Sequence, residues 1–220
     1  MKFKFLIIIA LVLSAPVFAQ DKPKEAYPFE NEIKAFKKQD SIRMPKPGGI
    51  LFIGSSSIRK WVDLPKHYPN KAIIMRGVGG SKLSAWVTTY MPYVVFPYQP
   101  SKIFIYAGDN DLAAGRSVQA VYNDLVTLYT MIRKELPNAE FYFMSLKLSP
   151  SRARWYAEVA QADKLIADYL KDKKGAHYID VNTTLLTPKA LPDSALFQKD
   201  MLHLNTSGYD KWEQVIAKYL

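Results

Sequence analysis

The sequence predicts an α/β fold: a three-layer α/β/α sandwich around a mostly parallel, five-stranded sheet. Five short and nearly continuous apolar runs recur along the 220 residues, as expected of strands that are buried on both faces. Segments with helical periodicity lie between these runs, and strand and helix in alternation produce a parallel sheet covered by helices. The chain is 49% hydrophobic and 23% charged, so one globular domain of this length can bury a sizeable core.

The first 48 residues are expected to precede this domain. Residues 1–19 combine a lysine-bearing start, a short apolar run and small residues at Val17 and Ala19, which is the pattern of a secretory signal peptide. The apolar run is too short for a membrane span, so we expect cleavage after Ala19 and no stable membrane insertion. Residues 20–48 are polar and contain prolines, which indicates a surface arm with a short helix near "FENEIKAFKKQD". We therefore expect a secreted or periplasmic protein whose domain covers residues 49–220.

Strands and helices can be assigned in order along that domain. The expected strands are "GILFIG" (49–54), "AIIMRG" (72–77), "KIFIYAG" (102–108), "EFYFMSL" (140–146) and "AHYIDV" (176–181). Apolar residues recur on one face of 117–136 and of 152–174, which predicts two long helices ending at Pro137 and Gly175. A last helix begins near Ser207. The proline- and aromatic-rich segment 90–100 is expected to be a packed connection.

Composition excludes several kinds of chemistry. The chain has no cysteine, so disulfides, thiolate metal sites and a cysteine nucleophile are impossible. Its formal charge is +10, and removal of Lys2 and Lys4 with the signal would leave 10 − 2 = +8. The lysines are scattered along the sequence, which favours a solvated basic surface over a nucleic-acid site.

Hydroxyl, glycine and acidic residues follow the first three expected strands as "GSSS", "GVGGS" and "GDND". In a parallel sheet the carboxyl ends of the strands lie at one edge, where ligands bind. A serine there needs a base to become a nucleophile. His203 is a candidate base, because Asp200 lies three residues before it and can orient its imidazole. Each feature also has a simpler interpretation, since serines cap helices and an Asp near a His can cap a turn.

Two of the same strand ends offer donors for an oxyanion. The glycine pair of "RGVGGSKL" allows close approach of a backbone N–H to a substrate, and Asn110 carries a side-chain amide. The alternatives are a tight strand-to-helix turn for the glycines and an Asx turn or helix cap for "GDND".

Taken together, these blocks resemble the SGNH, or GDSL-type, serine hydrolase superfamily from about residue 49 to the end. The resemblance implies a flavodoxin-like SGNH hydrolase fold. It also implies roles for individual residues: a nucleophile, an acid and a base at Ser56, Asp200 and His203, and oxyanion donors at Ser56, Gly80 and Asn110.

The chain departs from the family pattern in two blocks. The first block of the family reads Gly-Asp-Ser, but here Ser55 replaces the aspartate, and the spacing from Gly54 favours Ser56 over its neighbours as the nucleophile. In the third block, acids flank the asparagine at Asp109 and Asp111, and they shape either the pocket or only its turn.

The function implied is an exported serine esterase that hydrolyses short, in particular acetyl, carboxylic esters on carbohydrate. The alternatives are a lysophospholipase or thioesterase, and a non-catalytic glycan-binding module on the same fold. Lys147 and Arg152 in "SLKLSPSRARWYAEV" are candidate substrate-binding residues at the cleft rim. We expect neither a cofactor nor a metal, since no acid or histidine has a recognisable ligand spacing. Nucleic acid is not an expected partner, and the oligomeric state is left open.

Overall fold

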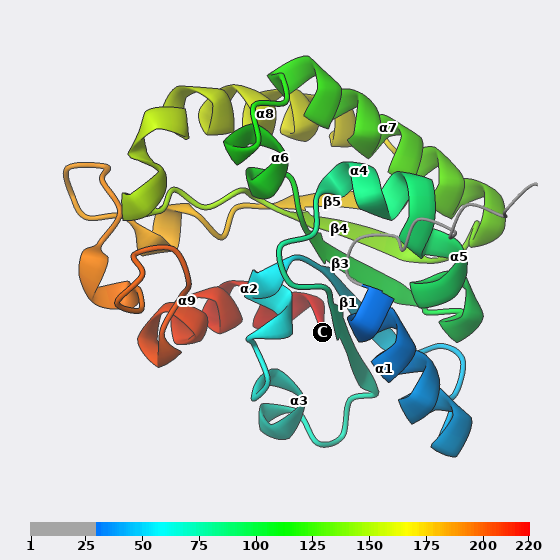
Figure 1. Cartoon of the computed structure of the whole chain (residues 1–220). Coiled ribbons are helices and arrows are strands. Elements are labelled where there is room, and N and C mark those ends of the chain that lie inside the picture. Colours follow the sequence, from blue (N-terminus) through cyan, green and yellow to red (C-terminus); the bar gives the residue numbers. More distant parts are fainter. Residues whose placement is uncertain (1–29) are drawn as a thin grey trace, which may run out of the picture.

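The computed structural model describes residues 30–220, in which the five expected strands form a single parallel sheet (Figure 1). The strand order is β2-β1-β3-β4-β5, and each neighbouring pair is parallel. The α/β prediction is thus confirmed. The expected signal peptide and residues 20–29 of the expected arm lie outside the described residues.

The strands begin and end close to their expected positions. Their bounds are β1 (Ile50–Gly54), β2 (Ile73–Gly77), β3 (Lys102–Tyr106), β4 (Glu140–Met144) and β5 (Ala176–Ile179). The helices are α1 (Glu30–Ile42), α2 (Ser56–Arg59), α3 (Leu64–His67), α4 (Leu83–Ala85), α5 (Met91–Val94), α6 (Asp109–Ala113), α7 (Val118–Glu135), α8 (Tyr156–Leu170) and α9 (Thr206–Ile216). Shorter 3₁₀ or π segments are η1 (Trp86–Tyr90), η2 (Phe96–Tyr98), η3 (Pro150–Trp155), η4 (Thr183–Leu185), η5 (Ser194–Leu196) and η6 (Ala217–Tyr219).

One expected helix is interrupted. The single helix predicted over 152–174 is replaced by the 3₁₀ segment η3, followed by α8, which ends at Leu170. Arg152 has φ −115° and ψ 27°, outside the helical region. The backbone N–H of Ser151 also donates to the carbonyl of Met201 at 3.0 Å, so a distant loop holds this segment and prevents a regular first turn.

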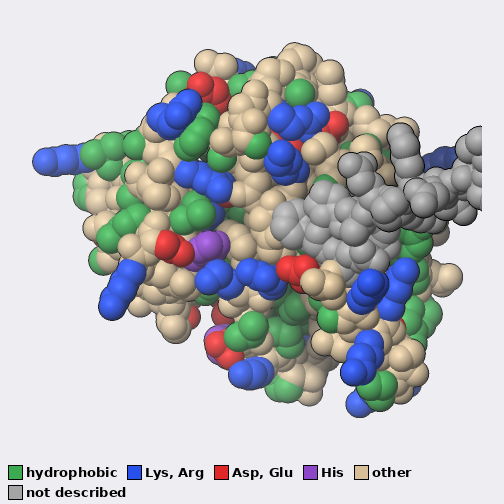
Figure 2. Space-filling view, viewed as in Figure 1, with side chains coloured by type: hydrophobic (Ala, Val, Ile, Leu, Met, Phe, Trp, Pro, Cys, Tyr) green, Lys and Arg blue, Asp and Glu red, His purple; other side chains and the backbone are tan. Residues whose placement is uncertain are grey.

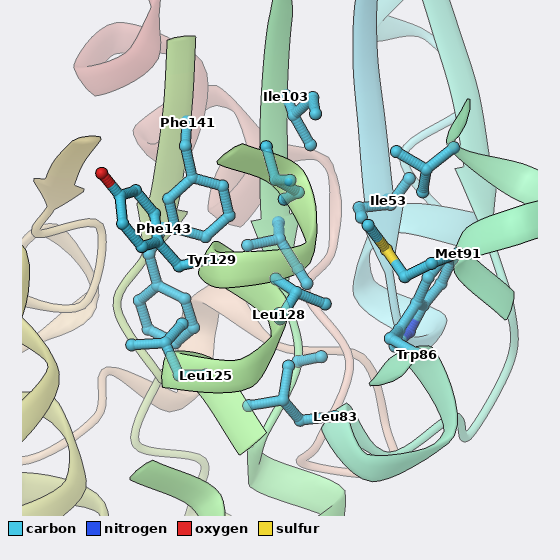
Figure 3. Close-up of a cluster of buried hydrophobic side chains, with 14 of the residues drawn as sticks. Ile53, Leu83, Trp86, Met91, Ile103, Leu125, Leu128, Tyr129, Phe141 and Phe143 are labelled. Carbon is cyan, nitrogen blue, oxygen red and sulfur yellow. The ribbon is translucent and has the colours of Figure 1, made fainter. Parts of the chain in front are cut away.

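Successive residues of the strands point alternately into two hydrophobic cores, one on each face of the sheet. Leu51 and Ile53 of β1 face a core that also contains buried residues of α4, α5, α7 and α8 (Figure 3). Ile50 and Phe52 face the other core, which α2, α3 and α9 cover. This alternation produces the three-layer sandwich. Full burial of each large apolar side chain contributes about 1.5–3 kcal/mol relative to its exposure.

Helix α1 is fastened to the domain by a buried polar cluster. Ile33 is buried in the first core. The Arg76 guanidinium donates to Asp40 at 2.6 Å and to the Tyr98 hydroxyl at 2.6 Å, and that hydroxyl donates to Asp40 at 2.5 Å.

The expected packed connection at 90–100 forms the α5 and η2 segments, in which Met91, Val94 and Tyr98 are buried.

Charged side chains do not gather into one patch on the face seen in Figure 2, where lysine and arginine are interspersed with acidic and apolar side chains. None of the helices within residues 30–220 is long and apolar enough to cross a membrane.

Candidate active site

The candidate site lies where the strand order reverses. The chain passes from β1 to β2 on one side and then to β3 on the other, and in open α/β sheets ligands bind beyond the carboxyl ends of the strands at such a reversal. Ser56 follows β1 and Asn110 follows β3, so both lie at this edge of the sheet.

The turn between β1 and α2 places Ser56 at this edge of the sheet. Gly54 has φ 137°, and a Cβ atom there would lie 2.0 Å from the Tyr106 carbonyl oxygen, so only glycine fits. The N–H of Ser55 donates to that same carbonyl at 2.9 Å. Ser55 and Ser57 are buried, whereas Ser56, the first residue of α2, is partly exposed. Of the three hydroxyls, that of Ser56 is therefore the one open to a substrate.

A tight loop before α9 carries Asp200 and His203. Pairing between Phe197 and Leu204 closes this loop at its base. One carboxylate oxygen of Asp200 accepts the backbone N–H groups of Leu202 and His203, each at 3.0 Å. The other lies 2.6 Å from Nδ1 of His203. The carboxylate thus caps its own loop and holds the imidazole in place.

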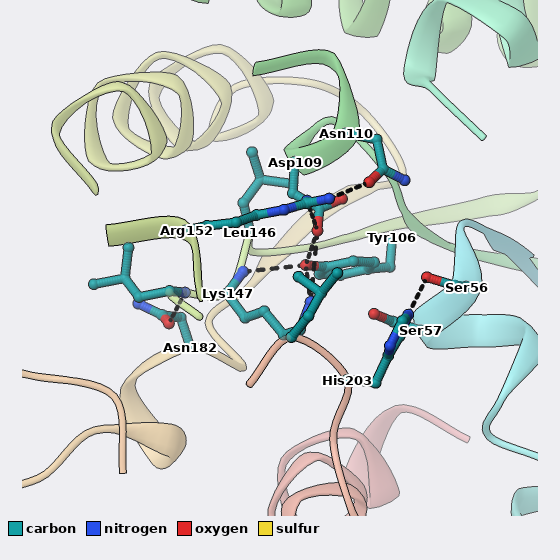
Figure 4. A network of polar contacts seen from close by, with 12 residues as sticks. Ser56, Ser57, Tyr106, Asp109, Asn110, Leu146, Lys147, Arg152, Asn182 and His203 are labelled. Atoms are coloured by element: carbon teal, nitrogen blue, oxygen red, sulfur yellow. Dashed lines mark hydrogen bonds and ion pairs between the residues drawn. The ribbon is translucent and has the colours of Figure 1, made fainter. Parts of the chain in front are cut away.

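The imidazole connects the acid to the serine. Nε2 of His203 lies 2.9 Å from Oγ of Ser56, and the two side chains point toward each other in Figure 4. Partial burial opposes ionisation of Asp200, but hydrogen bonds from the His203 ring and from the backbone outweigh it and hold the pKa of Asp200 well below its ordinary value. An ionised carboxylate can only accept, so Nδ1 carries a proton, and in the neutral imidazole the Nε2 lone pair then faces the Ser56 hydroxyl.

The two further candidate oxyanion donors lie on neighbouring segments. Gly80 is exposed and has φ 73°, in the region that favours glycine. Asn110 lies in the first turn of α6, and its Nδ2 donates to the Ser81 carbonyl at 3.0 Å. Ser81 is buried and accepts a hydrogen bond from the Trp86 indole at 3.1 Å. The Gly80 and Asn110 segments are therefore joined directly.

Lys147 and Arg152, expected at the substrate rim, belong to a polar network beside Asn110 (Figure 4). Lys147 is 3% exposed, and its ammonium lies 3.1 Å from the Tyr106 hydroxyl and 3.5 Å from Asp109. The Arg152 guanidinium is partly exposed and donates to Asp109 at 2.9 Å and to Oδ1 of Asn110 at 2.6 Å.

The two acids of the third block have different surroundings. Asp111 is fully buried, and it accepts from the Leu83 N–H at 2.6 Å and from Arg116 at 2.8 Å, so it fastens the start of α4. Burial would raise the pKa of Asp109, but Lys147 and Arg152 outweigh it and hold that pKa below its ordinary value. Asp109 is therefore a buried carboxylate that balances two cations beside the site.

Sequence reasoning missed Tyr106, whose buried hydroxyl donates to Asp109 at 3.2 Å. An aromatic residue at the end of a buried strand looks like an ordinary core residue, so no local signal marks it. Burial raises the pKa of Tyr106, which keeps its hydroxyl available as a donor.

The other two histidines form pairs elsewhere. His67 lies 2.8 Å from Glu213, and His177 lies 2.7 Å from Glu140 on β4. Among the residues that the structure describes, no group of three or more His, Cys, Asp or Glu could hold a metal ion.

Comparison with known proteins gives one family match. The model of the GDSL-like lipase/acylhydrolase family matches residues 54–211, which include both the serine turn and the loop before α9. No curated protein sequence matches the chain.

Solved structures resemble the chain in fold. A GDSL-like lipase from Bacteroides thetaiotaomicron has a TM-score of 0.72 at 17% identity, with 85% of this chain and 96% of that chain covered. A carbohydrate esterase of family 3 from Talaromyces cellulolyticus has a TM-score of 0.64 at 12% identity, with 78% and 95% covered. A family 3 carbohydrate esterase from Clostridium thermocellum has a TM-score of 0.60 at 16% identity, with 79% and 97% covered.

Proposed function

The chain belongs to the GDSL-like lipase/acylhydrolase family, and on that premise we propose that it is a serine hydrolase of short-chain, in particular acetyl, carboxylic esters on carbohydrate. The observation that carries this proposal is the continuous chain of hydrogen bonds from Asp200 through His203 to Ser56, with atom distances of 2.6 and 2.9 Å. Family membership implies hydrolysis of esters. The roles of individual residues and the substrate are our proposal.

In the first step, Oγ of Ser56 attacks the ester carbonyl carbon while its proton passes to Nε2 of His203. The 2.9 Å contact between these atoms supports a direct transfer. The imidazolium that forms is stabilised by the Asp200 carboxylate, which stays ionised because its pKa is depressed. The carbonyl oxygen becomes an oxyanion held by the N–H groups of Ser56 and Gly80 and by the Asn110 amide.

In the second step, His203 returns the proton to the leaving alcohol, and the acyl group remains on Ser56. Water then attacks the acyl-enzyme, with His203 again accepting a proton and finally returning it to Ser56. Each step uses the same donors and the same base. No cofactor takes part in this mechanism.

Two observations support a short acyl group on a polar alcohol. The surroundings of Ser56 include a charged network formed by Tyr106, Asp109, Lys147 and Arg152, which is a poor environment for a long alkyl chain. A surface pocket of about 650 Å³, lined by apolar residues together with lysine and arginine, lies at the β2 edge instead, and neither Ser56 nor His203 lines it. Two proteins of similar fold are carbohydrate esterases, which is consistent with this substrate class.

We also propose that the protein acts outside the cytoplasm, after cleavage following Ala19. The support is the signal-like pattern of residues 1–19. Mass spectrometry of the mature protein's amino terminus after expression in a bacterial host would test it, since a start at Gln20 is expected and an intact Met1 would contradict export.

The substrate proposal is tested by a competition between ester classes. Acetate release from acetylated xylan and peptidoglycan fragments is compared with fatty-acid release from lysophospholipid and from esters of increasing chain length. We expect kcat/KM to be highest for acetyl esters. A kcat/KM that climbs beyond about eight carbons, by roughly 0.8 kcal/mol for each buried CH₂, would indicate a lipase instead. Absence of turnover on all of these esters would favour a binding module.

A further inference from the structure

The Asn110 side chain is held at both ends. Nη2 of Arg152 donates to Oδ1 of Asn110 at 2.6 Å, and Nδ2 of Asn110 donates to the Ser81 carbonyl at 3.0 Å (Figure 4). A guanidinium can only donate and a carbonyl can only accept. A flipped amide would place donor against donor and acceptor against acceptor, so the two contacts together determine which atom of Asn110 lies on the Ser81 side.

Arg152 is itself held in place. Its Nη1 donates to Asp109 at 2.9 Å, so the planar guanidinium bridges two consecutive residues of α6. Asp109 is buried, and the same carboxylate oxygen, Oδ2, also accepts from the Tyr106 hydroxyl at 3.2 Å. Rotation of the Arg152 side chain toward a substrate would leave this carboxylate with fewer partners, at a cost in free energy.

The backbone around Arg152 is connected to the catalytic loop. Ser151, the preceding residue, donates its N–H to the carbonyl of Met201, which lies between Asp200 and His203. The segment that carries Arg152 is thereby attached to the loop that carries the proposed acid and base, and its side chain reaches across to the proposed oxyanion donor.

From this geometry we infer that Arg152 is a positioning residue for the oxyanion hole: it fixes the Asn110 amide in the donor orientation and polarises it. The inference rests on the proposed function. It gives Arg152 a different role from the substrate-binding one expected from the sequence. A cation at the amide oxygen draws electron density from the nitrogen, so the free N–H becomes a stronger donor to an oxyanion. A donor held in place before the reaction also needs no reorganisation in the transition state.

The test is a set of variants measured on a simple acetyl ester with the full mature protein. Arg152→Met removes both hydrogen bonds and keeps the aliphatic stem, and Arg152→Lys keeps the charge but cannot bridge both partners. Asn110→Ala removes the donor, and the double variant combines Asn110→Ala with Arg152→Met. The matched control is Arg154→Met, because Arg154 lies on the same η3 segment but stacks over Trp155, with 4.4 Å between its guanidinium carbon and the ring centroid.

We expect Arg152→Met to lower kcat by roughly tenfold to a hundredfold with little change in KM, as for a displaced catalytic group. Arg152→Lys should recover part of this loss, and Arg154→Met should behave as wild type. In the Asn110→Ala background, Arg152→Met should have almost no further effect, because Arg152 would then have no donor to position. Thermal unfolding and active-site titration correct kcat for any loss of folded protein, and Arg152→Lys keeps the test valid if Arg152→Met is poorly folded.

Three results would overturn the inference. A rise in KM with unchanged kcat would assign Arg152 to substrate binding. An equal loss in the wild-type and Asn110→Ala backgrounds would mean that Arg152 acts independently of Asn110. Wild-type kcat in both Arg152 variants would mean that Asn110 needs no support. These results all require an active wild-type enzyme, whereas a wild type without ester turnover would contradict the proposed function itself.

Discussion

Nε2 of His203 lies 2.9 Å from Oγ of Ser56, although the two residues are 147 positions apart in the sequence. Packing between α2 and α9 brings them together. The Tyr209 hydroxyl on α9 donates to the Ser57 carbonyl on α2 at 2.8 Å, and the Trp61 and Tyr209 rings stack with centroids 5.4 Å apart. The buried contacts of Tyr209 with Ser57 and Trp61 therefore hold together the two segments that carry Ser56 and His203.

Ser56→Ala should abolish ester hydrolysis while leaving the melting temperature unchanged, because the hydroxyl is partly exposed and its main contact is His203. At most the weak background from the oxyanion donors should remain. Activity assays, thermal unfolding and fluorophosphonate labelling with peptide mapping measure this. Ser55→Ala is the matched control, since the Ser55 hydroxyl is buried without a hydrogen-bond partner and its removal should cost neither activity nor stability. Loss of activity in the Ser55 variant alone would assign the nucleophile to Ser55.

His203→Ala should be as damaging as Ser56→Ala, and the double variant hardly worse, because the two groups act as a unit. Asp200→Asn should also be strongly damaging, because the N–H groups of Leu202 and His203 hold the single amide oxygen, so the amide NH₂ faces Nδ1 of His203 and favours the unproductive tautomer. In the wild type, kcat/KM should fall on the acid side with a single protonation, because the depressed pKa of Asp200 keeps that carboxylate ionised where imidazoles become protonated. Steady-state kinetics of the variants across pH measure both effects. Additive losses, or an acid limb with two protonations, would contradict this coupling.

Asp163→Asn should stabilise the protein at alkaline pH. Burial, with the nearby Asp180 charge, raises the pKa of Asp163 from 3.8 to about 8, although its side chain accepts the Leu146 N–H at 3.0 Å. The native state therefore holds a proton that the unfolded state releases, so this group lowers stability as pH rises from 3.8 to about 8 and the penalty is complete above that. Asparagine keeps an acceptor without the charge.

Urea unfolding at pH 5 and pH 9 measures this effect. The free energy of unfolding of Asp163→Asn should exceed that of wild type at pH 9 by more than at pH 5. Asp168→Asn is the control on the same helix, because Asp168 is exposed and pairs with Lys164. A difference between Asp163→Asn and wild type that does not change with pH would show that Asp163 is ionised throughout.

Asp40→Ala should destabilise the domain, because it leaves the Arg76 guanidinium with an uncompensated charge at a site where the two side chains are 10% and 16% exposed. Removing one partner of a buried ion pair typically costs about 3 kcal/mol or more. Urea unfolding measures the change, with Lys38→Ala as the control on the exposed face of α1. A loss below about 0.5 kcal/mol would mean that α1 contributes little and that the domain proper begins near residue 49.

The parts of the molecule that depend on local pattern were predictable from the sequence. Apolar runs identify all five strands, since each run is decided by its own residues, even though three of the four residues of the edge strand β5 are only partly buried. The glycine that ends β1 marks the serine turn, because no other residue fits at φ 137°. The strand ends also indicate that Ser56 and Asn110 lie at the same edge of the sheet, since the carboxyl ends of parallel strands share one edge.

The tertiary structure alone decided which distant side chains become partners. Lys147 and Arg152 look like rim residues in the sequence, yet one is buried beside Tyr106 and the other bridges Asp109 and Asn110. The predicted helix over 152–174 breaks at Arg152 because η3 is hydrogen-bonded to the loop of Met201. Hydrogen bonds between residues far apart in the sequence depend on how the layers of the fold pack together. The periodicity of a segment, in contrast, reflects only which of its own residues are buried. For this reason the strands can be predicted from the sequence, but the polar network of Lys147, Arg152 and Asp109 beside Asn110 cannot.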